Sequence, residues 1–236
     1  MRHPPQVRRT LVIMAKAPRE GTVKTRLTQC LPSPAVTSLY CCLLEDTVAL
    51  ARSLSGIQTA VMCPGHDVDD LQRFLTNGTP IVAQTGTGLA AGLTSVFASF
   101  SASDRHHVIA FNSDSPHLPL AALENAFRVL TTHDMVIGPT HDGGYYLVGA
   151  RAAYPTLFQN DGLGTRSALE RLMARAGVLD LSTGLTEPFY DIDVAEDLIR
   201  LRDELRLAPL KAPRTAAWFS EWQPAIAHIR SRLEES

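Results

Sequence analysis

Short apolar runs alternate with helical patterns along most of this sequence. Runs rich in strand-forming residues cover 10–15, 57–63, 80–84, 108–111 and 135–138, and a stretch with helical spacing follows each of the first four. Parallel strands need a crossover connection, usually a helix, so this alternation predicts a mainly parallel sheet with helices packed against it. The expected fold class is α/β, a three-layer α/β/α sandwich.

Apolar residues that recur every three or four positions mark the buried faces of the expected helices. The clearest helix opens at Ser33, a suitable N-cap followed by Pro34, and its apolar positions continue to Ala51. We expect further helices over 68–75, 88–100, 119–130, 165–176 and 195–205.

The strand–helix rhythm changes after residue 138. Gly143 and Gly144 form a turn signal, and the strand pattern of 145–149 follows with no helix between. We therefore expect this strand to join antiparallel, which makes the sheet mixed. Residues 188–193 are expected to be extended.

Charge and apolar composition exclude several classes of protein. Twenty-two basic residues against 24 acidic ones give a net charge of −2, so no global basic field draws the chain to nucleic acid or to an anionic membrane. Apolar runs such as 11–15 are far shorter than the roughly 20 residues that span a bilayer. Residues 1–9 are interpreted as a leader before the first strand. We expect no nucleic-acid and no membrane partner.

The number and spacing of the cysteines indicate the cellular compartment in which the protein is expected. The four cysteines include no CxxC pair, and no histidines are spaced around them as zinc ligands would be; they are Cys30, Cys41, Cys42 and Cys63. Buried thiols in a reduced, cytoplasmic protein are the expectation.

The C-terminal stretch is expected to be an extension of a main domain. We expect the main domain over 1–207 and a helical extension over 208–236, because 208–213 reads as a break. Trp218, Phe219, Trp222 and Ile226 fall on one helical face, although Pro224 interrupts the pattern. Packing on the main domain is the first interpretation, and a homodimer contact is the alternative.

The loop after the first strand combines cations with small residues. It contains Lys16, Gly21, Lys24, Thr25 and Arg26, a set that fits a cradle for phosphate, since the cations neutralise the anion and glycine permits close backbone approach. A P-loop is excluded because two residues separate Gly21 from Lys24. A solvated basic loop is the alternative. If the loop binds phosphate, Lys24→Ala is expected to weaken nucleotide binding by about 1.5–3 kcal/mol. It is expected to change folding little, because an exposed loop cation contributes little stability.

Aspartates follow later strands of the expected sheet. Asp114 comes just after the fourth strand, Asp142 lies in the turn with Gly143 and Gly144, and Asp191 and Asp193 alternate on an extended segment. Carboxylates are good oxygen ligands for Mg²⁺. Turn and helix-capping roles remain open as alternatives for each.

Four segments resemble those of a glycosyltransferase-like family, the radical-SAM/selenodomain-associated transferase group. These are residues 15–27 (AKAPREGTVKTRL), 112–116 (NSDSP), 138–149 (GPTHDGGYYLVG) and 191–198 (DIDVAEDL), within a similarity over about 10–205. The relatives belong to the nucleotide-diphospho-sugar transferase superfamily, which has a Rossmann-like GT-A fold. More distantly, the chain resembles phospholactate guanylyltransferase and the molybdenum-cofactor nucleotidyltransferases.

The resemblance implies a nucleotide-dependent transferase. Lys16, Gly21, Lys24, Thr25 and Arg26 match the nucleotide-binding loop. Asp114, Asp191 and Asp193 match the positions that hold Mg²⁺, or Mn²⁺ in its place. Catalytic roles fall to Asp114, Lys24 and Asp142, the last as a base or hydroxyl ligand near the acceptor. The chain departs from the family pattern at 112–113, where Asn-Ser replaces Gly-Thr, and at 194–195, where Val-Ala replaces Thr-Pro and removes the usual helix cap.

Two questions about function stay open. Both a nucleoside triphosphate and a nucleotide-sugar are suitable donors to a small acceptor. The sequence therefore does not distinguish nucleotidyl transfer from glycosyl transfer. A nucleotide-binding protein with weak catalysis that acts through a partner or a dimer is the alternative function.

The three carboxylates are expected to repel one another without metal, so Asp114→Asn should leave the fold as stable or more stable.

Overall fold

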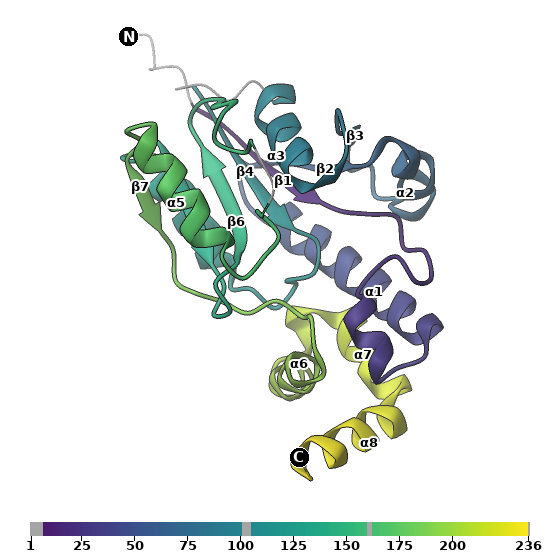
Figure 1. Ribbon diagram of the computed structural model, residues 1–236. Helices are drawn as coiled ribbons and strands as arrows, with labels where there is room; N and C mark the ends of the chain where they lie inside the picture. The colour runs from purple at the N-terminus through teal and green to yellow at the C-terminus, as the bar shows by residue number, and fades with distance from the viewer. Residues whose placement is uncertain (1–6, 101–104, 160–161, 236) are drawn as a thin grey trace. The chain divides into compact units, whose positions relative to one another are not determined.

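The computed structural model describes residues 7–100, 105–159 and 162–235, and it divides into two compact units. The first unit comprises Met1–Lys16, Ala51–Asn112 and Pro119–Tyr190; the second comprises Ala17–Leu50, Ser113–Leu118 and Asp191–Ser236. Figure 1 shows the chain coloured from its N-terminus to its C-terminus. Each unit is therefore assembled from three separate stretches of sequence.

The first unit contains a seven-stranded sheet with the order β3-β2-β1-β4-β6-β5-β7. Its strands are β1 (Arg8–Met14), β2 (Gln58–Cys63), β3 (Ile81–Ala83), β4 (His106–Asn112), β5 (Met135–Pro139), β6 (Tyr145–Ala150) and β7 (Thr183–Leu185). All neighbouring pairs are parallel except those of β6, which runs antiparallel to β4 and to β5. The expected mixed, mainly parallel sheet is confirmed.

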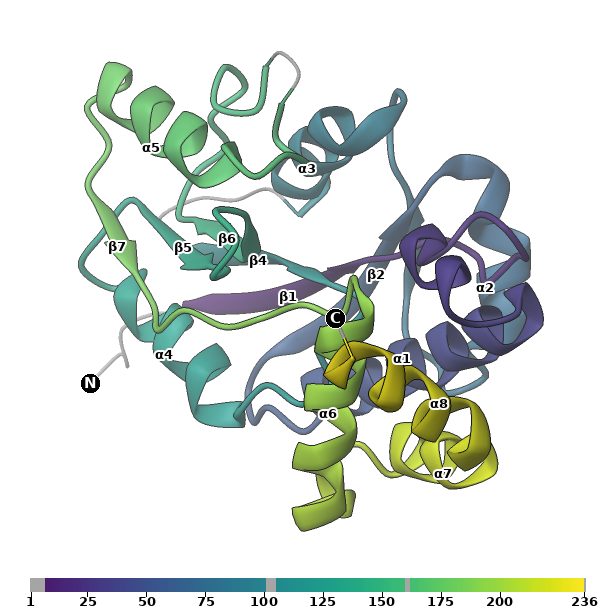
Figure 2. The ribbon, with the colours of Figure 1, turned by 60° about the horizontal axis from the view of Figure 1, so that its bottom comes forward.

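Helices cover both faces of this sheet. The helices α3 (Gly88–Ser99) and α5 (Ala168–Val178) lie on one face, and α4 (Leu120–Val129) lies on the other (Figure 2), while α2 (Val68–Phe74) packs beside β3. The α3 and α5 face holds one continuous core, in which Phe97 and Phe158 stack with ring centroids 5.2 Å apart. The three-layer α/β/α class is thus confirmed.

The opposite face packs tightly around the end of α4. A Cβ on Gly149 of β6 would come 2.7 Å from Ile109, 2.8 Å from Val136 and 3.1 Å from Leu130. These distances are too short for an ordinary contact, so glycine allows the Leu130 side chain to reach the sheet.

The second unit is helical. It contains most of α1 (Ser33–Arg52), the short 3₁₀ helices η1 (Thr25–Gln29) and η3 (Pro209–Lys211), and the helices α6 (Ala195–Leu207), α7 (Pro213–Glu221) and α8 (Gln223–Glu234). The helix α6 contacts both α7 and α8. The expected division of the chain at residue 207 stays a prediction.

The aromatic face of the C-terminal stretch packs inside the second unit. Trp218 and Phe219 are buried with Ile226, and Trp222 is half-buried and stacks on Trp218. The indole N–H of Trp218 donates a hydrogen bond of 2.8 Å to Ser38 Oγ in α1. The stretch is two helices that meet at Trp222, because Pro224 fits the first turn of a new helix better than the interior of a long one.

Four details differ from the sequence-based expectations. The three-residue strand β7 was not expected, and residues 188–193 form only an isolated bridge between Phe189 and Thr140. The helix α5 begins at Ala168, three residues later than expected. Residues 1–6 of the expected leader lie outside the described residues, and β1 already begins at Arg8.

The helix α1 is long and apolar enough to cross a membrane by length and composition alone. More than half of its most apolar stretch is buried inside the protein, which is typical of a core helix. Its fully buried side chains include Leu39, Leu43 and Leu44.

Candidate functional site: a lysine between two carboxylates

The loop that follows β1 is shaped by two residues with left-handed backbone. Gly21 has φ of 71° and Lys24 has φ of 46°, which is uncommon for a residue with a side chain. Buried Val23 and Leu27 anchor the loop, while Gly21 and Thr25 are exposed. The Leu27 N–H bonds the Lys24 carbonyl at 2.9 Å and begins η1.

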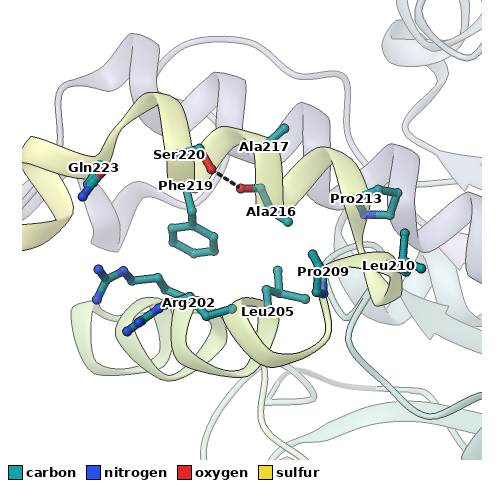
Figure 3. Close-up of a pocket in the computed structure, with 11 residues that line it drawn as sticks. Arg202, Leu205, Pro209, Leu210, Pro213, Ala216, Ala217, Phe219, Ser220 and Gln223 are labelled. Atoms are coloured by element: carbon teal, nitrogen blue, oxygen red, sulfur yellow. Dashed lines mark hydrogen bonds between the residues drawn. The ribbon is translucent and has the colours of Figure 1, made fainter.

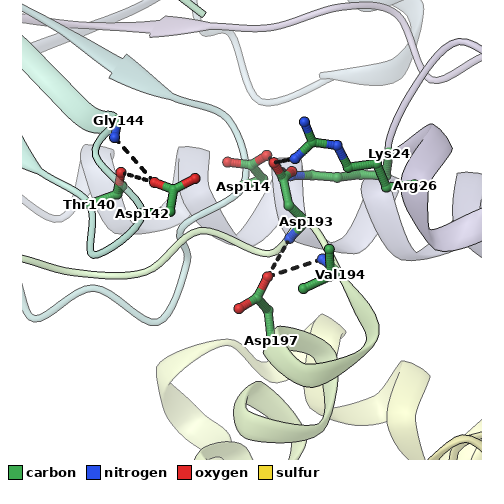
Figure 4. A network of polar contacts seen from close by, with 9 residues as sticks. All are labelled: Lys24, Arg26, Asp114, Thr140, Asp142, Gly144, Asp193, Val194 and Asp197. Atoms are coloured by element: carbon green, nitrogen blue, oxygen red, sulfur yellow. Dashed lines mark hydrogen bonds and ion pairs between the residues drawn. The ribbon is translucent and has the colours of Figure 1, made fainter. Parts of the chain in front are cut away.

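This geometry directs Lys24 to two carboxylates from distant parts of the sequence. Its ammonium forms ion pairs with Asp114 and with Asp193, at 3.0 Å from Asp193 Oδ1 (Figure 4). Arg26 Nη1 lies 3.2 Å from the other oxygen of Asp193. Lys24, Arg26, Asp114 and Asp193 thus form one cluster, the lysine cluster, inside the second unit.

Lys24 is buried, which corrects the expectation of an exposed loop cation. Its side chain is only 7% exposed, against 15% for Asp114 and 36% for Asp193. Burial works against the ammonium and lowers its pKa, but the negative charges of Asp114 and Asp193 outweigh burial, so the pKa of Lys24 is raised. The lysine is fully charged at neutral pH.

The Asp114 segment is fixed through its neighbour Ser113. The hydroxyl groups of Ser113 and Tyr40 of α1 share a hydrogen bond of 3.0 Å, and both residues are buried. In the sequence, Ser113 stands out only as a departure from the family pattern. Two features of the sequence could have indicated this hydrogen bond: a serine directly before Asp114, and a tyrosine in the buried face of the first helix.

Asp193 is fixed by the N-terminus of α6. The Asp197 carboxylate accepts hydrogen bonds from the backbone N–H groups of Asp193 and Val194, both at 3.0 Å. Asp197 thus supplies the half of a capping box that reaches back to the N-cap N–H, while Val194 has no side-chain acceptor to supply the half that a threonine would give. Ile192 is fully buried next to Asp193 and holds this segment against the core.

Two of the expected metal ligands face a single cation in the lysine cluster. Oxygens of Asp114 and Asp193 already converge on one positive nitrogen, so the ammonium stands in for a cation between them. Across the described residues, however, no group of three or more His, Cys, Asp or Glu side chains is arranged to hold a metal. Asp191 is half-buried two residues before Asp193, and the three-carboxylate site stays a prediction.

Asp142 and Lys16 belong to the first unit. Asp142 Oδ1 accepts hydrogen bonds from the Thr140 hydroxyl at 2.6 Å and from the Gly144 N–H at 3.2 Å (Figure 4). Partial burial raises the pKa of Asp142, but these hydrogen bonds outweigh it and the pKa is lowered. An acidic carboxylate is a weak base, so this geometry favours a role as hydroxyl ligand. Lys16 is exposed.

Two hollows lie outside the lysine cluster. One, of about 560 Å³, is in the first unit beside Asp142 and is lined by Gly143, Thr165, Arg166, Ser167, Leu169 and Glu170. The other, of about 470 Å³, lies in the second unit between α6 and α7, with Leu205 and Phe219 facing each other and Arg202 and Gln223 at one end (Figure 3).

With this geometry in place, the family can be assigned. Residues 47–165 match the family described as "Uncharacterized protein conserved in bacteria (DUF2064)". The chain belongs to this family. No curated protein matches its sequence.

Solved structures with the same fold extend the assignment. A protein of Desulfovibrio desulfuricans G20, provisionally assigned as a nucleotide-diphospho-sugar transferase, superposes with a TM-score of 0.82 at 22% identity over 93% of this chain and 97% of that one. CMP:2-keto-3-deoxy-manno-octonic acid synthetase, complexed with CTP, gives a TM-score of 0.56 at 11% identity over 85% and 99%. Rv0371c of Mycobacterium tuberculosis H37Rv, solved in complex with manganese, superposes with a TM-score of 0.52 at 20% identity over 83% of this chain and 98% of that one. The chain therefore has the expected GT-A-type fold.

Proposed function

We propose that this protein is a metal-dependent transferase that uses a nucleotide or nucleotide-sugar donor and a small acceptor. The observation that carries the proposal is the lysine cluster, in which two loop cations and two carboxylates meet. A transferase that acts on phosphate esters needs little more than positioned cations around the phosphate oxygens. The fold shared with a CTP-bound synthetase supports this interpretation.

In this proposal the cations of the loop bind the donor phosphates. Lys16, Lys24 and Arg26 neutralise the phosphate oxygens, and the left-handed turn at Gly21 lets the backbone and Thr25 approach them. Asp114, Asp191 and Asp193 would hold Mg²⁺ or Mn²⁺, which would neutralise charge on the donor during transfer. The manganese complex of Rv0371c, which has the same fold, supports a divalent ion.

Asp142 is proposed to orient the acceptor. Its exposed carboxylate lies beside the hollow that Thr165, Arg166 and Ser167 line. An acceptor hydroxyl could donate a hydrogen bond to the Asp142 carboxylate, whose lowered pKa lies even further below neutral pH than that of an ordinary aspartate. We further propose a cytoplasmic location, as expected from free cysteines.

The test begins with a panel of nucleoside triphosphates and nucleotide-sugars, each with Mg²⁺, with Mn²⁺ or with EDTA. The expected result is a metal-dependent rise in melting temperature with one class of donor. That donor is then incubated with candidate acceptors. Pyrophosphate release from a triphosphate identifies nucleotidyl transfer, and nucleoside diphosphate release from a nucleotide-sugar identifies glycosyl transfer.

Stabilisation without product on any acceptor would instead favour the binding protein with weak catalysis. Such a protein would act through a partner or a dimer, but Trp218 and Phe219 of the C-terminal stretch offer no exposed contact face, since both are buried within the second unit. Absence of any nucleotide effect would contradict the proposed function.

A further inference from the structure

The ammonium of Lys24 occupies the point at which the carboxylates of Asp114 and Asp193 meet. With Arg26 included, the lysine cluster has two positive and two negative side chains, so its charges balance. A divalent cation placed beside Lys24 would therefore meet a like charge and carboxylates that already have a partner. Lys24 and a divalent cation compete for the same two oxygen ligands.

The segments that carry the two carboxylates are held by hydrogen bonds that do not involve Lys24. Ser113, directly before Asp114, is bonded to Tyr40, and the backbone N–H of Asp193 is bonded to Asp197. The lysine side chain, in contrast, is a flexible stem of four methylenes that carries a compact charge. The ammonium can thus leave while both carboxylates stay in place.

We propose that Lys24 keeps the metal position closed in the free protein and opens it when a nucleotide binds, an inference that rests on the proposed function. The donor phosphates accept hydrogen bonds from the ammonium of Lys24. Lys24 then leaves its ion pairs with Asp114 and Asp193, whose oxygens become available to a divalent cation. Metal and nucleotide then bind with positive coupling, and each tightens the other by the same factor. A carboxylate pair open to metal at all times would instead bind the divalent cation in the free protein, and removing Lys24 would not tighten that binding.

The first experiment measures Mn²⁺ binding to the full chain without nucleotide, from the electron paramagnetic resonance signal of free Mn²⁺. The chain has three lysines, so Lys211→Met, an exposed position in η3, is a matched control for Lys24→Met. Removing a like charge at contact distance should tighten Mn²⁺ binding by about tenfold or more in Lys24→Met. Lys211→Met should bind Mn²⁺ like the wild type. Unchanged or weaker Mn²⁺ binding by Lys24→Met would overturn the proposal.

A second measurement needs no substitution. Nuclear magnetic resonance of the lysine side chains gives three ammonium-bearing groups to follow in the wild-type protein. Mg²⁺ together with the nucleotide selected by the panel should shift the Lys24 signal, while the same Mg²⁺ concentration alone should leave it in place. A full shift with Mg²⁺ alone would show that no nucleotide is needed and would contradict the coupling.

These results separate this inference from the proposed function. If the wild type binds no nucleotide under any condition, the proposed function fails, whereas the Mn²⁺ titrations still report on competition by Lys24. If nucleotides bind but Lys24→Met gains no Mn²⁺ affinity, the function stands and only the closed metal position is wrong. Circular dichroism verifies folding of each variant, and Lys24→Gln repeats the titration with a polar side chain if Lys24→Met does not fold.

Discussion

Asp46 in α1 accepts two hydrogen bonds from Thr215 in the first turn of α7, at 2.8 Å from the backbone N–H and 2.9 Å from the hydroxyl. Asp46 is 2% exposed and Thr215 is fully buried. The carboxylate therefore satisfies the free N–H groups at the start of α7 and ties the C-terminal helices to α1.

Asp46→Ala should lower the free energy of unfolding by about 2–3 kcal/mol, because two buried donors of Thr215 lose their acceptor. Urea denaturation measures this loss. The neighbouring Glu45 is a matched control, since it pairs with half-exposed Arg214 at 3.4 Å and Glu45→Ala should cost about 0.5 kcal/mol or less. Equal effects of the two variants would mean that the link between α1 and α7 contributes little.

Asp114→Asn should destabilise the metal-free protein by about 1–3 kcal/mol, because the buried ammonium of Lys24 loses one of its two charge partners. This reverses the sequence-based expectation of equal or higher stability. Unfolding is measured in EDTA so that no metal contributes. Asp193→Asn is the comparison and should cost less, since Asp193 is more exposed; a higher melting temperature for Asp114→Asn would restore the repulsion hypothesis.

The pH dependence of stability should carry a contribution from His106. Burial and the positive charge of Arg8 lower the pKa of His106 in the folded state below its ordinary value of 6.5. The folded state therefore binds fewer protons, so this contribution is present above pH 6.5 and is lost as the pH falls through the lowered pKa. His106→Gln should flatten the unfolding free energy over that range, whereas His228→Gln, an exposed position in α8, should retain the slope.

Gly143→Ala should destabilise the Asp142 loop. Gly143 has φ of 92°, and a Cβ there would lie 2.1 Å from the Arg166 carbonyl oxygen, so backbone must move. A loss of about 2 kcal/mol or more, together with loss of transfer activity, is expected. Gly177→Ala in α5 is the opposite case, since nothing lies within 4 Å and alanine favours a helix by about 0.5–1 kcal/mol. Thermal unfolding of both variants checks this: the melting temperature should fall for Gly143→Ala and rise for Gly177→Ala, and an unchanged melting temperature for Gly143→Ala would contradict the prediction.

The fold was largely predictable because its signals are local. Gly143 and Gly144 directly before a strand pattern leave no room for a crossover helix, which is why the antiparallel placement of β6 could be inferred. The strand β7 has only three residues, Thr-Gly-Leu, and so has too little pattern of its own; its pairing with β5 comes from tertiary structure.

The candidate site was predictable in composition but not in contacts. The cations and carboxylates were expected from their places after strands, yet nothing local to Lys24 indicates that it is buried against Asp114 and Asp193. That contact depends on a left-handed backbone at Lys24 and on supports from Tyr40 and Asp197. For this reason the contacts of Lys24 and Asp114 lead to revised predictions for the stability of their variants.

The lysine cluster has a consequence for the order of folding. Lys24, Asp114 and Asp193 come one from each of the three sequence segments that form the second unit. Closing such long loops is entropically costly and slow, so contacts of this kind form late. A chain emerging from the ribosome carries its lysine long before both aspartates exist, and Lys24 can be buried with balanced charge only after residue 193 has been synthesised. The chemistry of the site is thereby withheld until all three segments have been synthesised.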